Sequence, residues 1–252
     1  MIAFDFSFAN VDFAAARSVG YEAAIGYLSP DAAKNWTPGR VKLAHAAGLG
    51  IAAAWESTAN RAAQGERAGF SDAMQANEQA KALGYPGPIF FAVDGDIPWS
   101  AVAPYFAQVV NALGRRAGIY GSLGVVSAAA AHGVAWRWQT EAWSGGAVSA
   151  AAHLYQRVTP TVTIPGAHPG SYDQDDVLQP VPFWRVGTAS DPVLETGHLA
   201  SSAAALVGGR YAGPLRPGDL VATRSPGGTY RLARYVELPV PRLALLPTRP
   251  IP

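Results

Sequence analysis

The stretch IFFAVDGDIPW, residues 89–99, begins as an apolar strand and ends with two carboxyl groups. Its first five residues are apolar enough for a buried strand, and the acids that follow, Asp94 and Asp96, are separated by a single glycine. Because side chains alternate in direction along a strand, one face is expected to carry Phe90, Ala92, Asp94 and Asp96. The stretch therefore predicts a buried strand that carries two acids to one end of a sheet.

The composition of the 252-residue chain is that of a globular protein. Hydrophobic residues make up 49% and charged residues 15%, and the formal net charge is +1, with no basic cluster among aromatic residues. Nucleic acid is therefore not an expected partner. The chain has no cysteine, which excludes disulfides and thiolate metal sites, and its five histidines lack ligand spacing. We expect neither a metal nor an organic cofactor.

Targeting signals are not evident in the sequence. The N-terminal MIAFDFSFAN has no positively charged segment ahead of an apolar stretch. No run approaches the roughly 18 apolar residues that a membrane span needs. We therefore expect no export signal and no membrane span on this chain.

Strand and helix patterns alternate along residues 1–186. Strands are expected at 2–8, 22–29, 50–57, 89–93, 117–122, 136–143, 153–158 and 171–177. Helical patterns follow the first five strands, starting near residue 12 and then at 38–47, 66–83, 100–115 and 123–132. This alternation predicts an α/β fold, a closed (β/α)8 TIM-type barrel of parallel strands with reduced late helices. An open doubly wound sheet is the competing architecture.

The character of the sequence changes over residues 187–252. The segments GDLVATR (218–224) and TYRLARYVEL (229–238) flank SPGG and predict a β-hairpin, and residues 239–252 hold five prolines. We therefore expect two domains, a barrel over 1–186 and a small β-rich appendage over 187–252 that ends in a polyproline-like tail. Through this appendage the chain could dock on a protein partner.

Acids, amides and aromatic residues recur at the predicted strand ends. In a TIM barrel these ends form the mouth, where barrel enzymes keep their chemistry. Paired carboxyl groups suit glycoside hydrolysis, because one protonates the leaving oxygen while another acts as base, nucleophile or charge stabiliser. Aromatic rings near the ends could stack on sugars. The candidates are the acids Asp5, Glu56, Asp94, Asp96 and Asp173, the amides Gln139 and Gln156, and the rings of Tyr27, Trp55, Trp99, Tyr120, Trp143 and Tyr155.

Each of these features also has a structural interpretation. An Asp-Gly-Asp turn commonly caps backbone N–H groups or pairs with Arg, and single aromatic residues commonly belong to the core. Ser122 in YGSLG resembles a nucleophile elbow, but a Tyr stands where the elbow has Gly, which favours a turn residue. The acids near Asp173 could bind Ca²⁺, although the rest of a calcium loop is missing.

Eight short motifs, in this order along about residues 1–184, resemble those of a known family: FDFS, GYL, LGYPG, IFFAVDGD, GIYGS, WQTEAWS, LYQ and YDQDD. The chain resembles a glycoside-hydrolase-like domain of unknown function found in actinobacterial and phage proteins. That domain is distantly similar to the family 25 lysozymes, which cut the glycan strands of peptidoglycan. The resemblance implies a TIM-type barrel and does not extend to the C-terminal part.

The resemblance also implies roles for individual acids. By position, Asp5 matches the first-strand aspartate of the lysozymes, Asp94 the first acid of their Asp-x-Glu pair, and Asp173 their eighth-strand aspartate. Asp96 stands in the place of the proton-donating glutamate and is one methylene shorter. Since a displacement of about 1 Å affects such a step strongly, Glu56 on the adjacent strand is the longer alternative donor.

The leading hypothesis is a glycoside hydrolase-like protein that acts on peptidoglycan or another bacterial cell-envelope polysaccharide. Asp96 or Glu56 is then the general acid, and Asp94 and Asp173 support the charge at the anomeric carbon or position the substrate. The remaining substrate-binding candidates are Asp5, Tyr27, Trp55, Tyr120, Gln139 and Gln156. The alternative is a catalytically inactive glycan-binding or structural module, for example a phage tail component. Either protein is expected to act at the cell envelope.

Overall fold

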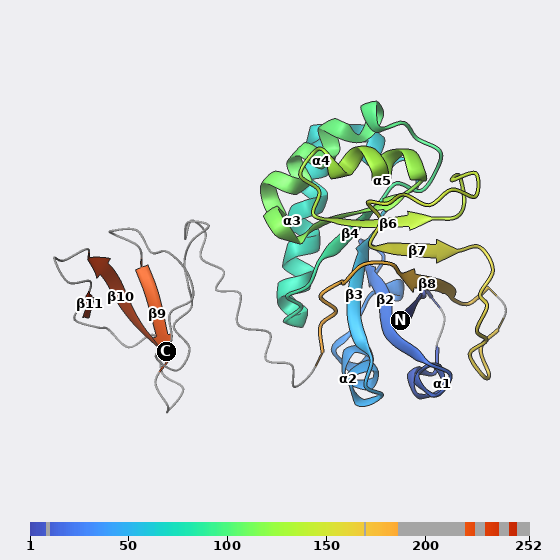
Figure 1. The fold of residues 1–252 in the computed structure, drawn as a ribbon, viewed down its shortest axis with the longest axis horizontal. Helices are drawn as coiled ribbons and strands as arrows, with labels where there is room; N and C mark the ends of the chain where they lie inside the picture. Colours follow the sequence, from blue (N-terminus) through green and yellow to red (C-terminus); the bar gives the residue numbers. More distant parts are fainter. Residues whose placement is uncertain (9–10, 169, 186–219, 225–229, 237–241, 246–252) are drawn as a thin grey trace. The chain divides into compact units, whose positions relative to one another are not determined.

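The computed structural model describes residues 1–8, 11–168, 170–185, 220–224, 230–236 and 242–245 (Figure 1). The chain divides into two compact units, Met1–Ala189 and Ser190–Pro252.

The first unit is a closed barrel of eight strands, in the order in which they occur along the chain. The strands are β1 (Ile2–Asp5), β2 (Tyr21–Leu28), β3 (Gly50–Trp55), β4 (Ile89–Ala92), β5 (Ala117–Gly121), β6 (Trp136–Thr140), β7 (Leu154–Arg157) and β8 (Asp173–Val177). Neighbouring strands from β1 to β7 pair in parallel. The predicted α/β barrel is therefore confirmed, and the open sheet is excluded.

The last strand differs from the all-parallel prediction, because β8 runs antiparallel to both β1 and β7. In Figure 1 the arrows of β6 and β7 point to one side and that of β8 to the other. A parallel return needs a crossover connection, usually a helix, and none of the described residues between Arg157 and Asp173 is helical. Consequently the N-terminal end of β8 lies at the mouth that the C-terminal ends of the other strands form.

Helices cover the first part of the barrel. They are α1 (Phe13–Ser18), α2 (Pro38–Ala46), α3 (Glu66–Leu83), α4 (Trp99–Leu113) and α5 (Leu123–Ala130), with short 3₁₀ turns η1 (Ala32–Lys34), η2 (Arg61–Gln64) and η3 (Gly114–Arg116). No α-helix follows β6 or β7 within the described residues, which confirms the reduced late helices. None of the helices in the described part of the chain combines the length and hydropathy of a bilayer span.

A turn-rich segment covers the outer face of β6 where a helix would otherwise pack. Gln139 is fully buried there, donates to Ala147 O over 2.7 Å and accepts from Ser149 N over 2.7 Å. These bonds satisfy a buried amide and hold the segment against the strand. Gln139 therefore has a structural role on the outer side of the barrel.

Side chains fill the barrel from both faces of the sheet. Small residues on β2 and β3 leave room inside for two large rings, Phe90 and Trp138, which meet edge to face with centroids 5.7 Å apart. The interior is therefore packed below the mouth, as in other TIM-type barrels. Between the sheet and the helices lies a second apolar layer, to which Trp55 and Phe91 belong.

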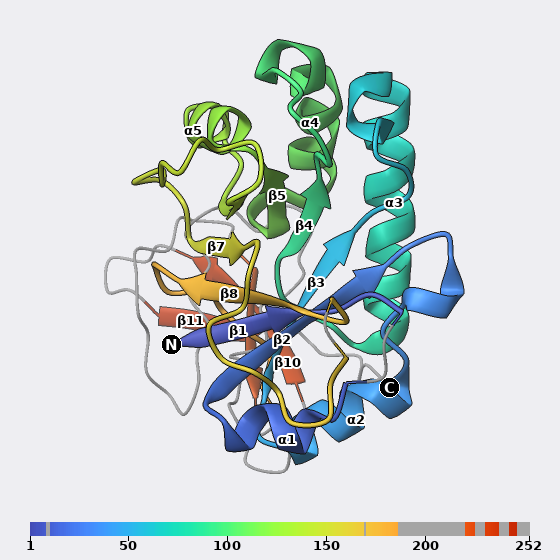
Figure 2. The same ribbon diagram turned by 90° about the vertical axis from the view of Figure 1, so that its right-hand side faces the viewer.

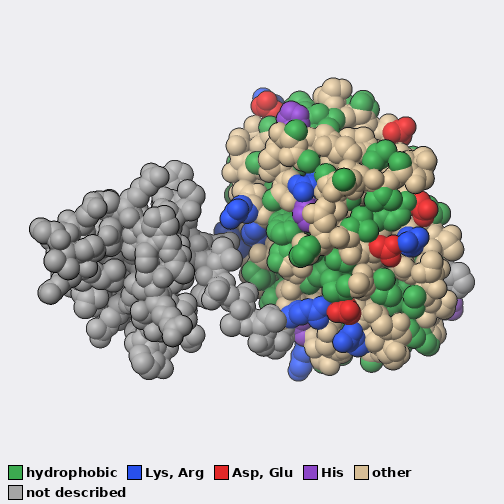
Figure 3. Space-filling view, in the orientation of Figure 1, with side chains coloured by type: hydrophobic (Ala, Val, Ile, Leu, Met, Phe, Trp, Pro, Cys, Tyr) green, Lys and Arg blue, Asp and Glu red, His purple; other side chains and the backbone are tan. Residues whose placement is uncertain are grey.

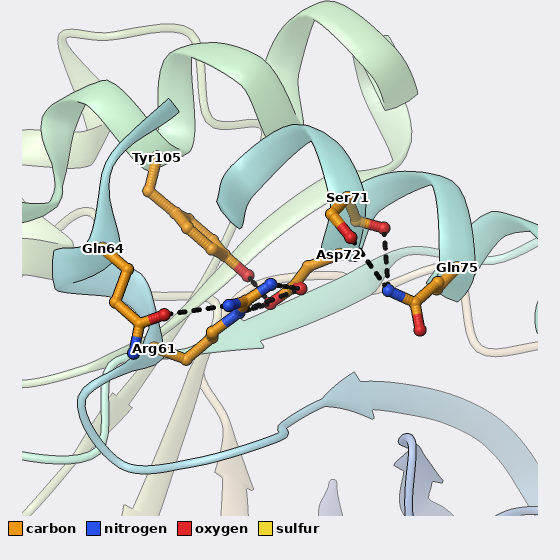
Figure 4. Close-up of polar contacts among 6 residues, drawn as sticks. All are labelled: Arg61, Gln64, Ser71, Asp72, Gln75 and Tyr105. Carbon is orange, nitrogen blue, oxygen red and sulfur yellow. Dashed lines mark hydrogen bonds and ion pairs between the residues drawn. The ribbon is translucent and has the colours of Figure 1, made fainter. Parts of the chain in front are cut away.

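Helices α3 and α4 lie side by side, as Figures 1 and 2 show. A Cβ added to Gly69 on α3 would lie 2.2 Å from Tyr105 O on α4, so only glycine permits this approach. A buried acid joins the same helices (Figure 4): Asp72 accepts two bonds from Arg61 Nε and one from the Tyr105 hydroxyl. Because the carboxyl group is almost fully buried, removing either partner would leave a costly unpaired group.

Replacing Gly69 with alanine should lower the free energy of unfolding by about 2 kcal/mol, because the new methyl group forces α3 and α4 apart. Urea unfolding measures this change. Gly124→Ala is the matched control, since Gly124 also lies in a helix, α5, where the nearest atom to an added Cβ is 3.8 Å away. The control should be neutral or stabilising by up to about 1 kcal/mol. Equal effects of the two substitutions would contradict the close packing of the helices.

The described part of the second unit is a three-stranded antiparallel sheet in the order β11–β10–β9. Its strands are β9 (Leu220–Arg224), β10 (Tyr230–Val236) and β11 (Arg242–Leu245). The pairing of β9 with β10 confirms the predicted hairpin. The strand β11 falls within the segment 239–252 that was predicted to be polyproline-like, and the other residues of that tail lie outside the described ones. The boundary at 186/187 stays a prediction.

Candidate active site

A pocket opens at the mouth of the barrel, with about 740 Å³ of empty space including its opening. The wall comes from the ends of several strands and from the residues before β8: Asp5, Phe6, Ser7, Tyr27, Ala54, Glu56, Ala92, Asp94, Tyr120, Trp138, Gln156, Gly170, Ser171, Tyr172 and Asp173. Seven of the ten residues predicted for the site therefore line one pocket.

Gln156 links three of these side chains. The Tyr120 hydroxyl donates to Gln156 Oε1 over 2.6 Å, which fixes the orientation of the amide. The Gln156 amide nitrogen then donates to Asp5 Oδ2 over 2.8 Å and reaches Asp173 Oδ2 at 3.4 Å. Two carboxyl groups are thus held beside a single neutral donor.

Asp175 lies deeper in the barrel, and sequence reasoning did not include it among the site residues. Its side chain is fully buried and accepts from the Trp138 indole N–H over 2.7 Å. Burial and the charge of Asp5 raise the pKa of Asp175 well above its usual value. The sequence pattern that could have identified Asp175 is the alternation of side chains along a strand, which places it on the same face as Asp173.

Asp5 and Asp175 are neighbouring buried carboxyl groups, and Asp175 Oδ2 has no hydrogen-bond partner among the described residues, so a proton on one of the two acids would relieve both the unpaired oxygen and the repulsion. Burial, followed by the charge of Asp173, raises the pKa of Asp5 from 3.8 to about 8, although the bond from Gln156 opposes this shift. At neutral pH the floor of the pocket is therefore protonated rather than doubly charged.

Glu56 has a cationic partner that sequence reasoning missed. Lys34 Nζ lies 2.7 Å from Glu56 Oε2 and 4.7 Å from the centroid of the Tyr27 ring. The lysine belongs to η1 and is buried, and this carboxylate and this ring compensate for the water that the ammonium group loses. A lone lysine in a short turn gives no sequence signal for such a role.

Asp94 and Asp173 are half-buried acids at the mouth. Burial and the negative charge of Glu56 raise the pKa of Asp94, while Lys34 lowers it. Burial raises the pKa of Asp173. Both groups consequently retain a proton to higher pH than an exposed aspartate does.

Three predicted residues are not brought into the pocket. Asp96 is exposed, because β4 ends at Ala92 and the chain bends at the following glycine, so the alternation of the strand no longer applies. Trp55 is almost fully buried in the outer layer, with its ring centroid 6.4 Å from that of Phe91. Gln139 is buried on the outer face of β6, as described above. The structure therefore does not bring these three side chains into the pocket, contrary to the expectation.

The rest of the described part of the chain shows mixed charge on the face in view and no group of metal ligands. On the face of the barrel unit that Figure 3 shows, charged side chains of both signs are spread among polar and apolar ones. Within the described residues, no three His, Asp or Glu side chains are grouped so that they could hold a metal ion.

A family model described as "Rv2525c-like, glycoside hydrolase-like domain" matches residues 14–177. The chain belongs to this family. The resemblance noted from the sequence motifs is thereby confirmed, including its restriction to the barrel. No curated protein sequence matches the chain.

Solved structures share the barrel fold of this family member. The Tat-secreted protein Rv2525c of Mycobacterium tuberculosis superposes with a TM-score of 0.64 at 22% identity, over 71% of this chain and 96% of that one. The modular autolysin LytC of Streptococcus pneumoniae gives 0.51 at 12% identity, over 69% and 46%. A bacterial lysozyme from Streptomyces coelicolor gives 0.49 at 13% identity, over 71% and 92%. At these identities, the likeness to Rv2525c and LytC shows a common fold.

The free energy of unfolding should fall as the pH rises from 6.5 to 8. In this range the folded protein retains protons on Asp5 and Asp175, because both pKa values are raised. In the unfolded chain the same carboxyl groups, with a pKa near 3.8, have already lost their protons. Unfolding therefore releases protons, and a higher pH favours the unfolded state. Each such proton contributes about 1.4 kcal/mol per pH unit. Burial lowers the pKa of His153 from 6.5 to about 4, so this group contributes with the opposite sign up to its unfolded pKa of 6.5, and the slope is therefore read in the upper part of the range, from about pH 7.5 to 8.

Asp175→Asn should flatten this slope by about the contribution of one proton. Asparagine keeps an oxygen for the Trp138 indole and offers an amide to Asp5, but it does not titrate. The exposed Asp96→Asn variant is the control and should keep the wild-type slope. Urea unfolding at half-unit steps of pH measures all three proteins, and an unchanged slope in Asp175→Asn would contradict the protonated floor.

Proposed function

We propose that this chain binds and cleaves a bacterial cell-envelope glycan in the pocket at the barrel mouth. The observation that carries the proposal is the contrast between two neighbouring acids. Asp94 has a raised pKa and forms no ion pair with a residue in the described part of the chain, whereas Glu56 forms an ion pair with Lys34. Acids kept in different charge states are what glycoside hydrolysis requires.

In this proposal Asp94 is the proton donor to the leaving oxygen, since its half-buried carboxyl group keeps its proton to higher pH. Glu56 remains a carboxylate and stabilises the positive charge that develops at the anomeric carbon. The Glu56 charge also raises the pKa of Asp94, so the two roles support each other. Asp173 and Gln156 position the sugar from the opposite wall, and the Tyr27 and Tyr120 rings complete the pocket.

Peptidoglycan is the first candidate substrate. The LytC structure, which shares the barrel fold, was solved with a synthetic peptidoglycan ligand, and Rv2525c is a Tat-secreted protein. Both support action at the cell envelope. Another envelope polysaccharide would present the same type of bond to the same acids.

A glycan-binding module without catalysis is the second candidate. It is favoured by the exposed position of Asp96, which stands where the related lysozymes have their proton donor, and by the engagement of Glu56 with Lys34. In that role residues 187–252 would dock the module to a partner, for example in a phage tail.

Asp94→Asn and Glu56→Gln should each lower glycan cleavage at least a hundredfold, because each removes one of the two charge states that the reaction needs. Asp94→Asn preserves side-chain shape and breaks no ion pair with a described residue, so its melting temperature should stay nearly constant, whereas Glu56→Gln unpairs the buried Lys34 and should lower the melting temperature. Mass spectrometry of products from purified peptidoglycan, over about pH 4 to 8, measures new reducing ends.

Asp96→Asn is the matched control, since it makes the same chemical change two residues away on an exposed side chain. It should cleave at the wild-type rate. Loss of activity in Asp96→Asn with full activity in Asp94→Asn would reverse the assignment of the donor. No product from the wild type, with peptidoglycan still retained by the folded protein, would select the binding module.

A further inference from the structure

Trp143 has an unusual backbone conformation. Its φ is 56°, and among the described residues it is the one non-glycine residue with a positive φ. For a bulky residue this region is a genuine outlier, because the Cβ crowds the backbone. A residue such as glycine would adopt the same turn without this strain.

The turn that holds Trp143 is fixed from both sides. Ser144 Oγ donates to Thr140 O over 2.6 Å and accepts from Leu123 N over 3.0 Å, so the turn is tied to the end of β6 and the start of α5. Glu141 N donates to Gln156 O over 2.8 Å, and Glu141 Oε2 accepts from Val158 N over 2.9 Å. The surrounding bonds thus impose the strained conformation.

Packing does not account for the tryptophan at this place. The side chain is 45% exposed, and among the described residues neither apolar cluster of the barrel includes it. The next two positions, Gly145 and Gly146, are open, with no atom within 4 Å of an added Cβ. An exposed side chain alone would be ordinary, but backbone strain of this kind clusters at ligand-binding and active sites, so the strained turn indicates a binding position.

The turn lies at the same end of the barrel as the pocket. Trp143 follows the last residue of β6, Thr140, by three residues, a span of at most about 11 Å between Cα atoms. Thr140 pairs in register with Gln156 of β7, which lines the pocket. An extended glycan that occupies the pocket would therefore reach the turn within a few sugar units.

We propose that the turn Trp143–Gly146 is a sugar-binding platform outside the pocket, where the indole face stacks on a distal pyranose of a bound glycan strand. This inference rests on the proposed function. It adds the requirement that the bound glycan be longer than the part that the pocket itself holds. The flat face of tryptophan offers a large apolar area to the C–H face of a pyranose, at little loss of side-chain freedom. The two glycines leave room for the ring of the sugar.

The test compares Trp143→Gly and Trp143→Phe in the full chain, in an Asp94→Asn background that prevents cleavage. Calorimetry measures binding of purified peptidoglycan glycan strands of increasing length and of the disaccharide unit. Trp143→Gly should weaken binding of long strands about tenfold, which corresponds to about 1.4 kcal/mol, and leave disaccharide binding unchanged. Trp143→Phe should restore most of the loss. Phe70→Ala, which removes an exposed ring on α3, is the control and should bind like the parent.

The melting temperature separates this role from a structural one. Because glycine relieves the backbone strain, Trp143→Gly should melt at the same temperature as the parent or a few degrees higher. A lower melting temperature, or unchanged binding of long strands, would overturn the platform while leaving the proposed function intact. Absence of glycan binding by the parent and the wild type would overturn the proposed function and the platform with it.

Discussion

The direction of β8 is the constraint on which the site depends. Because this strand closes the barrel antiparallel to β1, its first residue, Asp173, pairs in register with Asp5 at the mouth. The next inward position, Asp175, pairs with Ala3 and enters the barrel interior. A parallel β8 would place the same sequence in the opposite order and leave Asp173 at the far end. The hairpin-like return from β7, which lacks a helix, thus assembles three acids on one side of the pocket.

Burial then gives these acids different charge states. Asp5 and Asp175 lie at the inner end of the site, where desolvation raises both pKa values. At the rim, Lys34 pairs with Glu56, and the charge of Glu56 raises the pKa of Asp94. Carboxyl groups with raised pKa values therefore lie close to an ion pair. This separation of charge states is the physical basis of the proposed acid–base chemistry, and it arises from desolvation and one buried lysine.

The barrel could be predicted from the period of its strands and helices, and the acids at the mouth from their positions at strand ends. Trp55 was assigned to the pocket although it is adjacent to Glu56, and strand alternation forbids both on one face. Asp96 was placed by extending that alternation beyond Ala92, where the strand has ended. The direction of β8 and the partnership of Lys34 depend on tertiary contacts, for which a single sequence carries no periodic signal.

The proposed chemistry requires that a sugar bind between Asp94 and Glu56. A crystal structure of the Asp94→Asn variant with a soluble peptidoglycan glycan fragment would show where the sugar binds. We expect a pyranose in the mouth pocket, with its glycosidic oxygen within hydrogen-bond distance of residue 94 and its anomeric carbon facing Glu56. A fragment bound at another surface, with the pocket free of sugar at saturating concentration, would contradict it.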